Sequence, residues 1–167
     1  MTLVRVAAAM AAVVTALLLQ ATVVAPAAIT AQLSLPAVLV AAVALESGAG
    51  TGMSLGFAAG LIADLGSAHA AGLLAVCWMG VGICCGLLAD ERRRIVPEVL
   101  LAALAAVAAG ALTTLALTVV GEPGGTVLAA ASGVLPSLAG NLVLAALVVP
   151  LTRRLLGSEA LRTAGHG

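Results

Sequence analysis

The chain has 167 residues, of which 63% are hydrophobic and 8% are charged, and its formal net charge is zero. Soluble domains contain about 25% charged residues, so this composition excludes an ordinary water-soluble fold and predicts an all-α polytopic membrane protein. The basic residues are all arginines in three short groups, which is typical of markers of membrane topology and gives no support to nucleic-acid binding. They are Arg5, Arg92, Arg93, Arg94, Arg153, Arg154 and Arg162.

The first predicted span covers residues 3–25, which are apolar apart from Arg5, Thr15, Gln20 and Thr22. A secretory signal peptide would also begin with a basic residue and an apolar run. However, this run exceeds the roughly 7–15 residues of a signal sequence, and more apolar sequence follows it. We therefore expect a retained first helix.

The next apolar stretch, residues 35–65, is interrupted by Glu46, Ser47 and Gly48. A single straight helix here would be about 45 Å long, whereas the hydrocarbon core is about 30 Å thick. It would also place Glu46 near the middle of the membrane, which is unfavourable. The stretch therefore predicts two short spans, 35–46 and 50–65, with Glu46 as a solvated turn residue between them.

The second half of the chain predicts three longer spans, at residues 72–89, 96–120 and 135–156. The first of them is followed by a charged cytoplasmic loop, and Pro97 suits the first turn of the next helix. Pro136 is expected to break or kink the last apolar stretch, with a short segment before this residue and the last full helix after it. Residues 1–157 thus form one transmembrane domain, and residues 158–167 a flexible polar cytoplasmic tail. The loop consists of Asp90, Glu91, Arg92, Arg93 and Arg94.

Six spans, two of them short, place both termini and every arginine on the cytoplasmic side, as the positive-inside rule requires. Five spans would separate Arg5 from the other arginines. The charged loop then acts as an anchor that sets the topology and meets anionic lipids. A docking site for a cytoplasmic protein is the alternative for this loop.

Glycines recur at every fourth position from Gly48 through Gly52 and Gly56 to Gly60, and Asp64 takes the next step. On a helix these positions form one ridge, and small residues let helices approach closely in lipid. Phe57, the chain's single phenylalanine, lies beside this ridge. We interpret these residues as helix-packing or partner-contact candidates. A second smooth face, formed by Gly80, Gly82 and Gly86, is the expected mate of the ridge.

Polar residues inside apolar spans are further candidates for packing or partner contact. Asp64 could orient a helix end near water, contact a partner or bind a cation. Asn141 follows Pro136 in an apolar run, where its amide must find a partner, so we expect it to fix the position of a neighbouring helix. Ser137 or Asn141 could also satisfy backbone groups freed by Pro136.

The sequence predicts neither an enzyme nor a cofactor or metal site. His69 and His166 have no companions at ligand spacing, and no nucleophile or phosphate-binding motif is present. The cysteines Cys77, Cys84 and Cys85 share one apolar run, where thiols act as small hydrophobic side chains.

Two segments resemble the MreD family of rod shape-determining membrane proteins. Residues 55–65, LGFAAGLIADL, resemble the family signature Gly-Phe-x-x-Gly-Leu-hydrophobic-x-Asp-Leu. Residues 135–142, LPSLAGNL, followed by PLTRR at 150–154, resemble the family's last helix. The resemblance implies a fold similar to that of the six-helix substrate-binding subunits of energy-coupling-factor transporters.

The resemblance also implies a function: a non-enzymatic scaffold of the cell-elongation machinery, which builds peptidoglycan, in a bacterial plasma membrane. Its expected partner is the single-span protein MreC, and through it MreB, RodA and a penicillin-binding transpeptidase. A homodimer is also compatible with the sequence. The rival is a vitamin-uptake subunit, which needs a polar pocket with aromatic side chains. The chain offers only Phe57 and Trp78 for such a pocket.

Overall fold

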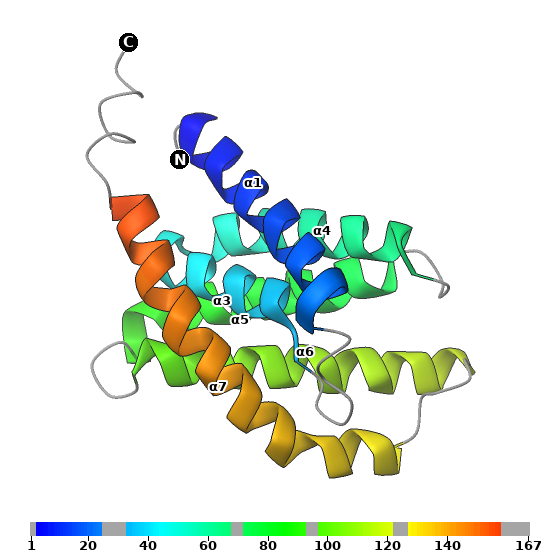
Figure 1. The fold of residues 1–167 in the computed structure, drawn as a ribbon. Helices are drawn as coiled ribbons and strands as arrows, with labels where there is room; N and C mark the ends of the chain where they lie inside the picture. The colour runs from blue at the N-terminus through cyan, green and yellow to red at the C-terminus, as the bar shows by residue number, and fades with distance from the viewer. Residues whose placement is uncertain (1–2, 25–32, 68–71, 93–96, 122–126, 158–167) are drawn as a thin grey trace.

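The computed structural model describes residues 3–24, 33–67, 72–92, 97–121 and 127–157. Six α-helices and one π-helical segment make up the regular structure of these residues (Figure 1), which confirms the all-α prediction. The predicted tail, the histidines and Arg93 and Arg94 lie outside the described residues. The elements are α1 (Leu3–Leu19), η1 (Gln20–Val24), α3 (Leu35–Ser47), α4 (Ala49–Leu65), α5 (Leu73–Arg92), α6 (Glu98–Val120) and α7 (Val127–Gly157).

Helix α3 forms the centre of the molecule. Ten consecutive residues, from Pro36 to Leu45, are buried, because the helix is apolar on every face and such a helix must be surrounded on all sides. It packs against α1, α4, α5, α6 and α7. Its 13 residues span only about 20 Å, so α3 is short for a membrane-crossing helix.

The predicted interruption between residues 35 and 65 is confirmed, and it falls at Gly48. This residue has φ +86°, a conformation that glycine adopts without a steric penalty, and its amide donates to the carbonyl of Ala44 at 2.8 Å. Because the chain reverses there, Gly48 leaves the register of α4. A Cβ at Gly48 would meet nothing within 4 Å, but the carbonyl carbon of Gly48 lies 2.6 Å from the position of a Cβ on Gly86. Gly48 therefore lies just outside α4, and its backbone still packs against α5.

The charged segment after residue 89 is helical for longer than expected. Asp90, Glu91 and Arg92 form the last turn of α5 instead of a loop, because all three tolerate a helix. Pro97 precedes α6 as its N-cap and is not part of its first turn. The Pro97 carbonyl accepts from the amides of Leu100 and Leu101 at 2.9 and 3.1 Å, which starts the helical hydrogen-bond pattern.

The prediction of two separate segments around Pro136 was wrong, because α7 runs through this residue from Val127 to Gly157. A proline inside a helix removes one hydrogen bond and bends the axis. Figure 1 shows the first turns of α7 inclined to the rest of the helix, which agrees with the alternative of a kink. The exposed position of Pro136 leaves room for its ring.

Two segments of the described chain are long and apolar enough to cross a membrane, judged by length and composition: Glu98–Val120 and Val134–Leu155. The other helices contain shorter apolar segments of 10–17 residues. Helices α3 to α6 run alternately in opposite directions, and α1 and α7 cross them obliquely (Figure 1). The end of α3, the start of α6 and the end of α7 therefore lie at one end of the molecule.

Candidate functional site

Helices α4 and α5 touch through their backbones along a glycine interface, formed by Gly52, Gly56 and Gly60 of α4 with Gly82 and Gly86 of α5. A Cβ added to Gly52 would lie within 3.0 Å of the Gly82 backbone, and one on Gly56 within 3.0 Å of the Trp78 backbone. Likewise, a Cβ on Gly60 would clash with Ala75, and one on Gly86 with Ala49. No side chain larger than hydrogen therefore fits at these five positions without separating the helices.

The expected pairing of the two smooth faces is thus confirmed for Gly82 and Gly86 but not for Gly80. A Cβ on Gly80 would meet nothing within 4 Å. At 3.6 residues per turn, Gly80 lies about 200° around α5 from Gly82, so the two cannot face the same neighbour. Phe57 also lies outside the interface, with 45% of its surface exposed on the outer side of α4.

Asp64 caps the start of α5. Its carboxylate accepts hydrogen bonds from the amides of Gly72 at 2.9 Å and of Leu74 and Ala75 at 3.2 Å. These amides lack partners within their own helix, and a negative charge is favourable at a helix N-terminus. Asp64 is 3% exposed, so it lies inside the protein and not in water. Its orienting role is seen in the structure, whereas partner contact and ion binding remain untested predictions.

Two amide side chains hold the start of α3. Asn141 of α7 is completely buried, and its Oδ1 accepts from the amide of Ser34 at 3.1 Å. From η1, Gln20 Nε2 donates to the carbonyl of Leu33 at 2.7 Å, while its Oε1 accepts from the amide of Leu35 at 2.9 Å. Asn141 therefore fixes a neighbouring helix, as predicted. The role of Gln20 was not predicted, although its position in an apolar run was the available signal.

Three charged side chains join the ends of α3, α6 and α7. Arg153 donates through Nε to Glu46 Oε1 at 2.8 Å and forms an ion pair through its terminal nitrogen with Glu98 Oε2. The Glu98 side chain is 8% exposed and that of Arg153 49% exposed. The prediction that Glu46 is only a solvated turn residue was wrong. Glu46 lies in the last turn of α3, from which its side chain reaches Arg153 of α7. This pairing could not be predicted because the two residues lie far apart in the sequence.

The described chain has an apolar core and also exposes many large apolar side chains. Large aliphatic residues are strongly exposed, including Leu65 and Val119, each at 80%, and Leu135 at 78%. Several polar side chains are buried, and those whose contacts are described above connect one helix to another. The buried polar or charged residues are Asp64, Glu98, Thr114, Ser137, Asn141 and Thr152.

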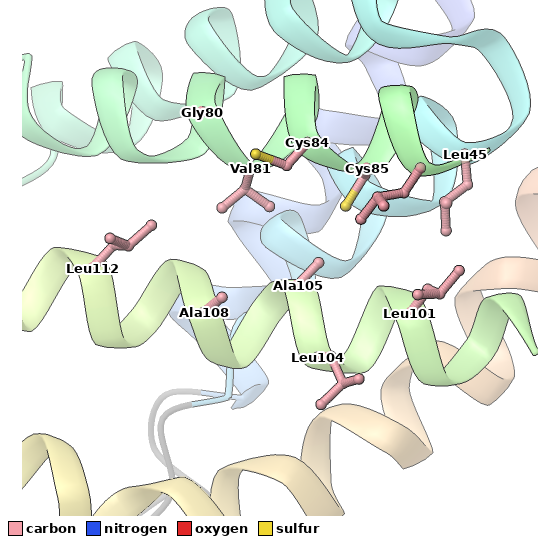
Figure 2. A pocket seen from close by; sticks show the side chains of 11 residues that line it. Leu45, Gly80, Val81, Cys84, Cys85, Leu101, Leu104, Ala105, Ala108 and Leu112 are labelled. Atoms are coloured by element: carbon pink, nitrogen blue, oxygen red, sulfur yellow. The ribbon is translucent and has the colours of Figure 1, made fainter. Parts of the chain in front are cut away.

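At least two hollows open between the helices of the described chain. The larger, of about 460 Å³, lies between α5 and α6 and has an apolar lining (Figure 2). The smaller, of about 240 Å³, lies beside the start of α3 and includes Ser34, Trp78, Thr113 and Thr114 in its lining. The two threonine hydroxyls donate to carbonyls of their own helix at 2.8 and 2.9 Å, so neither proton is directed at a ligand.

Within the described part of the chain, no group of three or more His, Cys, Asp or Glu side chains could hold a metal ion. Comparison with protein-family models, with curated proteins and with solved structures finds no match to this chain.

Proposed function

We propose that the chain is a six-span membrane protein and that it acts as a structural scaffold. The observation that carries the membrane placement is the apolar exterior, on which Leu65, Val119 and Leu135 are mostly exposed. Soluble monomers rarely expose contiguous apolar patches above a few hundred Å². In lipid, by contrast, apolar side chains face outward and polar groups must find partners inside. The internal contacts of Asp64 and Asn141 meet this requirement.

The arrangement of charges supports a topology with both termini in the cytoplasm. The ends that carry Glu46, Glu98 and Arg153 lie together, and the alternating helices bring the end of α5 to the same side (Figure 1). The last residue of α5 is Arg92. The positive-inside rule assigns this end to the cytoplasm. The short α3 fits a membrane because protein surrounds it, so its ends need not reach water.

The scaffold role rests on the resemblance to the MreD family. Three residues of the segment that carries it, Gly56, Gly60 and Asp64, all serve to join α4 to α5. The α4–α5 pair is thus a rigid unit with an aliphatic outer face. Its role is to present this face to the single transmembrane helix of an MreC-like partner, which connects it to MreB, RodA and a penicillin-binding transpeptidase in a bacterial plasma membrane.

The glycine interface provides the experiment. Gly56→Leu and Gly60→Leu place side chains against the backbones of Trp78 and Ala75, so the two helices must separate. We expect both variants to insert into membranes but to recover less of the MreC-like partner in a pull-down. Gly50→Leu, on the same helix with nothing within 4 Å of its added Cβ, is the matched control. Wild-type recovery with both interface variants would contradict the proposal.

The hollow beside the start of α3 supports the alternative function, a small-molecule uptake subunit, less well than the glycine interface supports the scaffold. Pockets for drug-sized ligands have volumes of about 300–1,000 Å³, and this hollow has about 240 Å³. Trp78 is its single aromatic residue, and the Thr113 and Thr114 hydroxyls donate within α6. A ring-bearing vitamin would need more space and more free donors than the hollow provides.

A further inference from the structure

The larger hollow is a groove bounded by α5 on one side and α6 on the other, and we call it the α5–α6 groove. Figure 2 shows the side chains of Val81 and Cys85 directed toward α6 and that of Ala105 directed toward α5. Leu45 of α3 contributes to the lining at one end. The groove exists because the glycine interface holds α5 close to α4, while small residues leave the side facing α6 unfilled.

The lining determines the chemistry of an occupant. Every lining side chain is that of Leu, Val, Ala, Gly or Cys. Gly80, Ala105 and Ala108 provide the empty space, and a Cβ on Gly80 would meet nothing within 4 Å. A polar ligand would lose its hydrogen bonds to water there without replacing them. The occupant must therefore present an apolar surface.

The dimensions of the groove distinguish a thin occupant from a thick one. Along α6 the lining extends from Leu101 to Leu112, which corresponds to about 16 Å at 1.5 Å per residue. The volume of 460 Å³ that the centres of water-sized spheres can occupy, divided by this length, corresponds to a width of about 6 Å. Adding the radius of a water, about 1.4 Å, at each wall gives a groove about 9 Å wide. An α-helix with side chains is about 10–12 Å wide. A single hydrocarbon chain fits, because its carbons approach neighbouring atoms at about 3.5–4.0 Å.

The position of the groove along the helices indicates which hydrocarbon chain occupies it. Its ends on α6 are Leu101, one turn after Glu98, and Leu112, near the middle of the helix. The groove therefore begins at the charged end of the molecule. Its length of about 16 Å equals about half of the 30 Å hydrocarbon core. That is the depth of one leaflet.

We infer that the α5–α6 groove binds one acyl chain of a phospholipid from the cytoplasmic leaflet. The inference rests on the proposed membrane placement, and the bound chain is an integral part of the helix packing: it fills the space that side chains leave between α5 and α6. A lipid held in this way is bounded by protein on two sides, whereas lipids around the outer aliphatic faces touch protein on one side only.

The test uses the full chain in phosphatidylcholine and phosphatidylglycerol vesicles that include a phosphatidylcholine with a diazirine at mid-chain. After illumination, mass spectrometry locates the lipid adducts. We expect several-fold more adducts on peptides lining the groove than on the outer face of α7 at Val143 and Leu147. Ala108→Phe and, from the opposite wall, Gly80→Leu should each reduce the groove adducts to the outer-face level. Ala146→Phe, at an exposed alanine of α7, is the control and should change nothing.

Equal adduct density on all faces, or groove adducts that persist in both filling variants, would overturn the inference. A dimer cross-linked through Cys84, with a groove free of adducts, would overturn it in favour of a second copy of the chain. Adducts on α7 together with flotation of the protein with the vesicles report the membrane placement separately. A protein that neither floats nor is labelled would contradict that placement, and the inference with it.

Discussion

Arg153 and Glu46 are 107 residues apart in the chain, yet the guanidinium Nε donates to the carboxylate at 2.8 Å. The same guanidinium forms an ion pair with Glu98, so one side chain of α7 connects the end of α3 to the start of α6. The central helix is held in a similar way at its other end, where Asn141 and Gln20 bind its first backbone groups. Polar contacts thus fix both ends of α3, and apolar packing surrounds its middle.

Replacing Arg153 with Ala should destabilise the protein by about 2 kcal/mol. The change removes one ion-pair partner from the buried Glu98 carboxylate, which is costly, although the half-exposed position of Arg153 reduces the effect. Unfolding in mixed detergent micelles measures the free-energy change. Arg154→Ala, at the adjacent exposed position, should stay within about 0.5 kcal/mol of wild type. Equal losses in the two variants would show that the ion pairs contribute nothing specific.

Two alanine substitutions in α5 should have opposite effects. Gly82→Ala forces a Cβ against the Gly52 backbone and should cost about 1–3 kcal/mol, the range for overpacking. Gly80→Ala enters open space and should stabilise the helix by up to about 1 kcal/mol, since alanine has the higher helix propensity. Thermal unfolding followed by the fluorescence of Trp78, the single tryptophan, reports both changes. The same sign in both would contradict the glycine interface.

Asp64→Ala should destabilise the start of α5 by about 1–3 kcal/mol, because three amide donors lose their acceptor in a buried place. Asp64→Asn should recover only part of this loss, since its amide group offers one acceptor oxygen where the carboxylate offers two. Backbone amide hydrogen exchange at Gly72, Leu74 and Ala75 should be faster in the Asp64→Ala variant than in the Asp64→Asn variant or the wild type. Unchanged exchange at these amides would rule out the capping role.

Asn141→Leu should lower stability by about 1–3 kcal/mol, because the amide of Ser34 loses its acceptor. Gln20→Leu should have a similar effect at Leu33 and Leu35. Because both side chains hold one helix start, the double variant should depart from additivity by 0.5 kcal/mol or more. Strict additivity in the double-mutant cycle would mean that the two contacts act independently.

The sequence predicted those features that depend on local residue pattern. Composition predicted an all-helical chain, and the Glu46–Gly48 interruption predicted the division between α3 and α4. The four-residue spacing of Gly52, Gly56 and Gly60 predicted a close helix contact, because this spacing repeats on one helix face. The isolated amide of Asn141 predicted an interhelical hydrogen bond.

The remaining features depend on contacts between segments that are far apart in the sequence. Gly48 fits the four-residue spacing of the glycines in α4, but the chain turns at Gly48, so this residue lies just outside the helix. Nothing near Glu46 in the sequence identifies Arg153 as its partner. The rule that proline ends or kinks a helix led to the prediction of two segments at Pro136. This rule considers only the local sequence and does not include the packing of neighbouring helices, which can keep a kinked helix continuous.

The most direct test of the scaffold proposal is purification of the tagged protein from its native membrane in mild detergent, with mass spectrometry of the proteins that accompany it. We predict recovery of an MreC-like single-span protein together with wall-synthesis enzymes. Recovery of a transmembrane coupling subunit with paired ATPases would contradict the scaffold proposal and identify the protein as part of an uptake system.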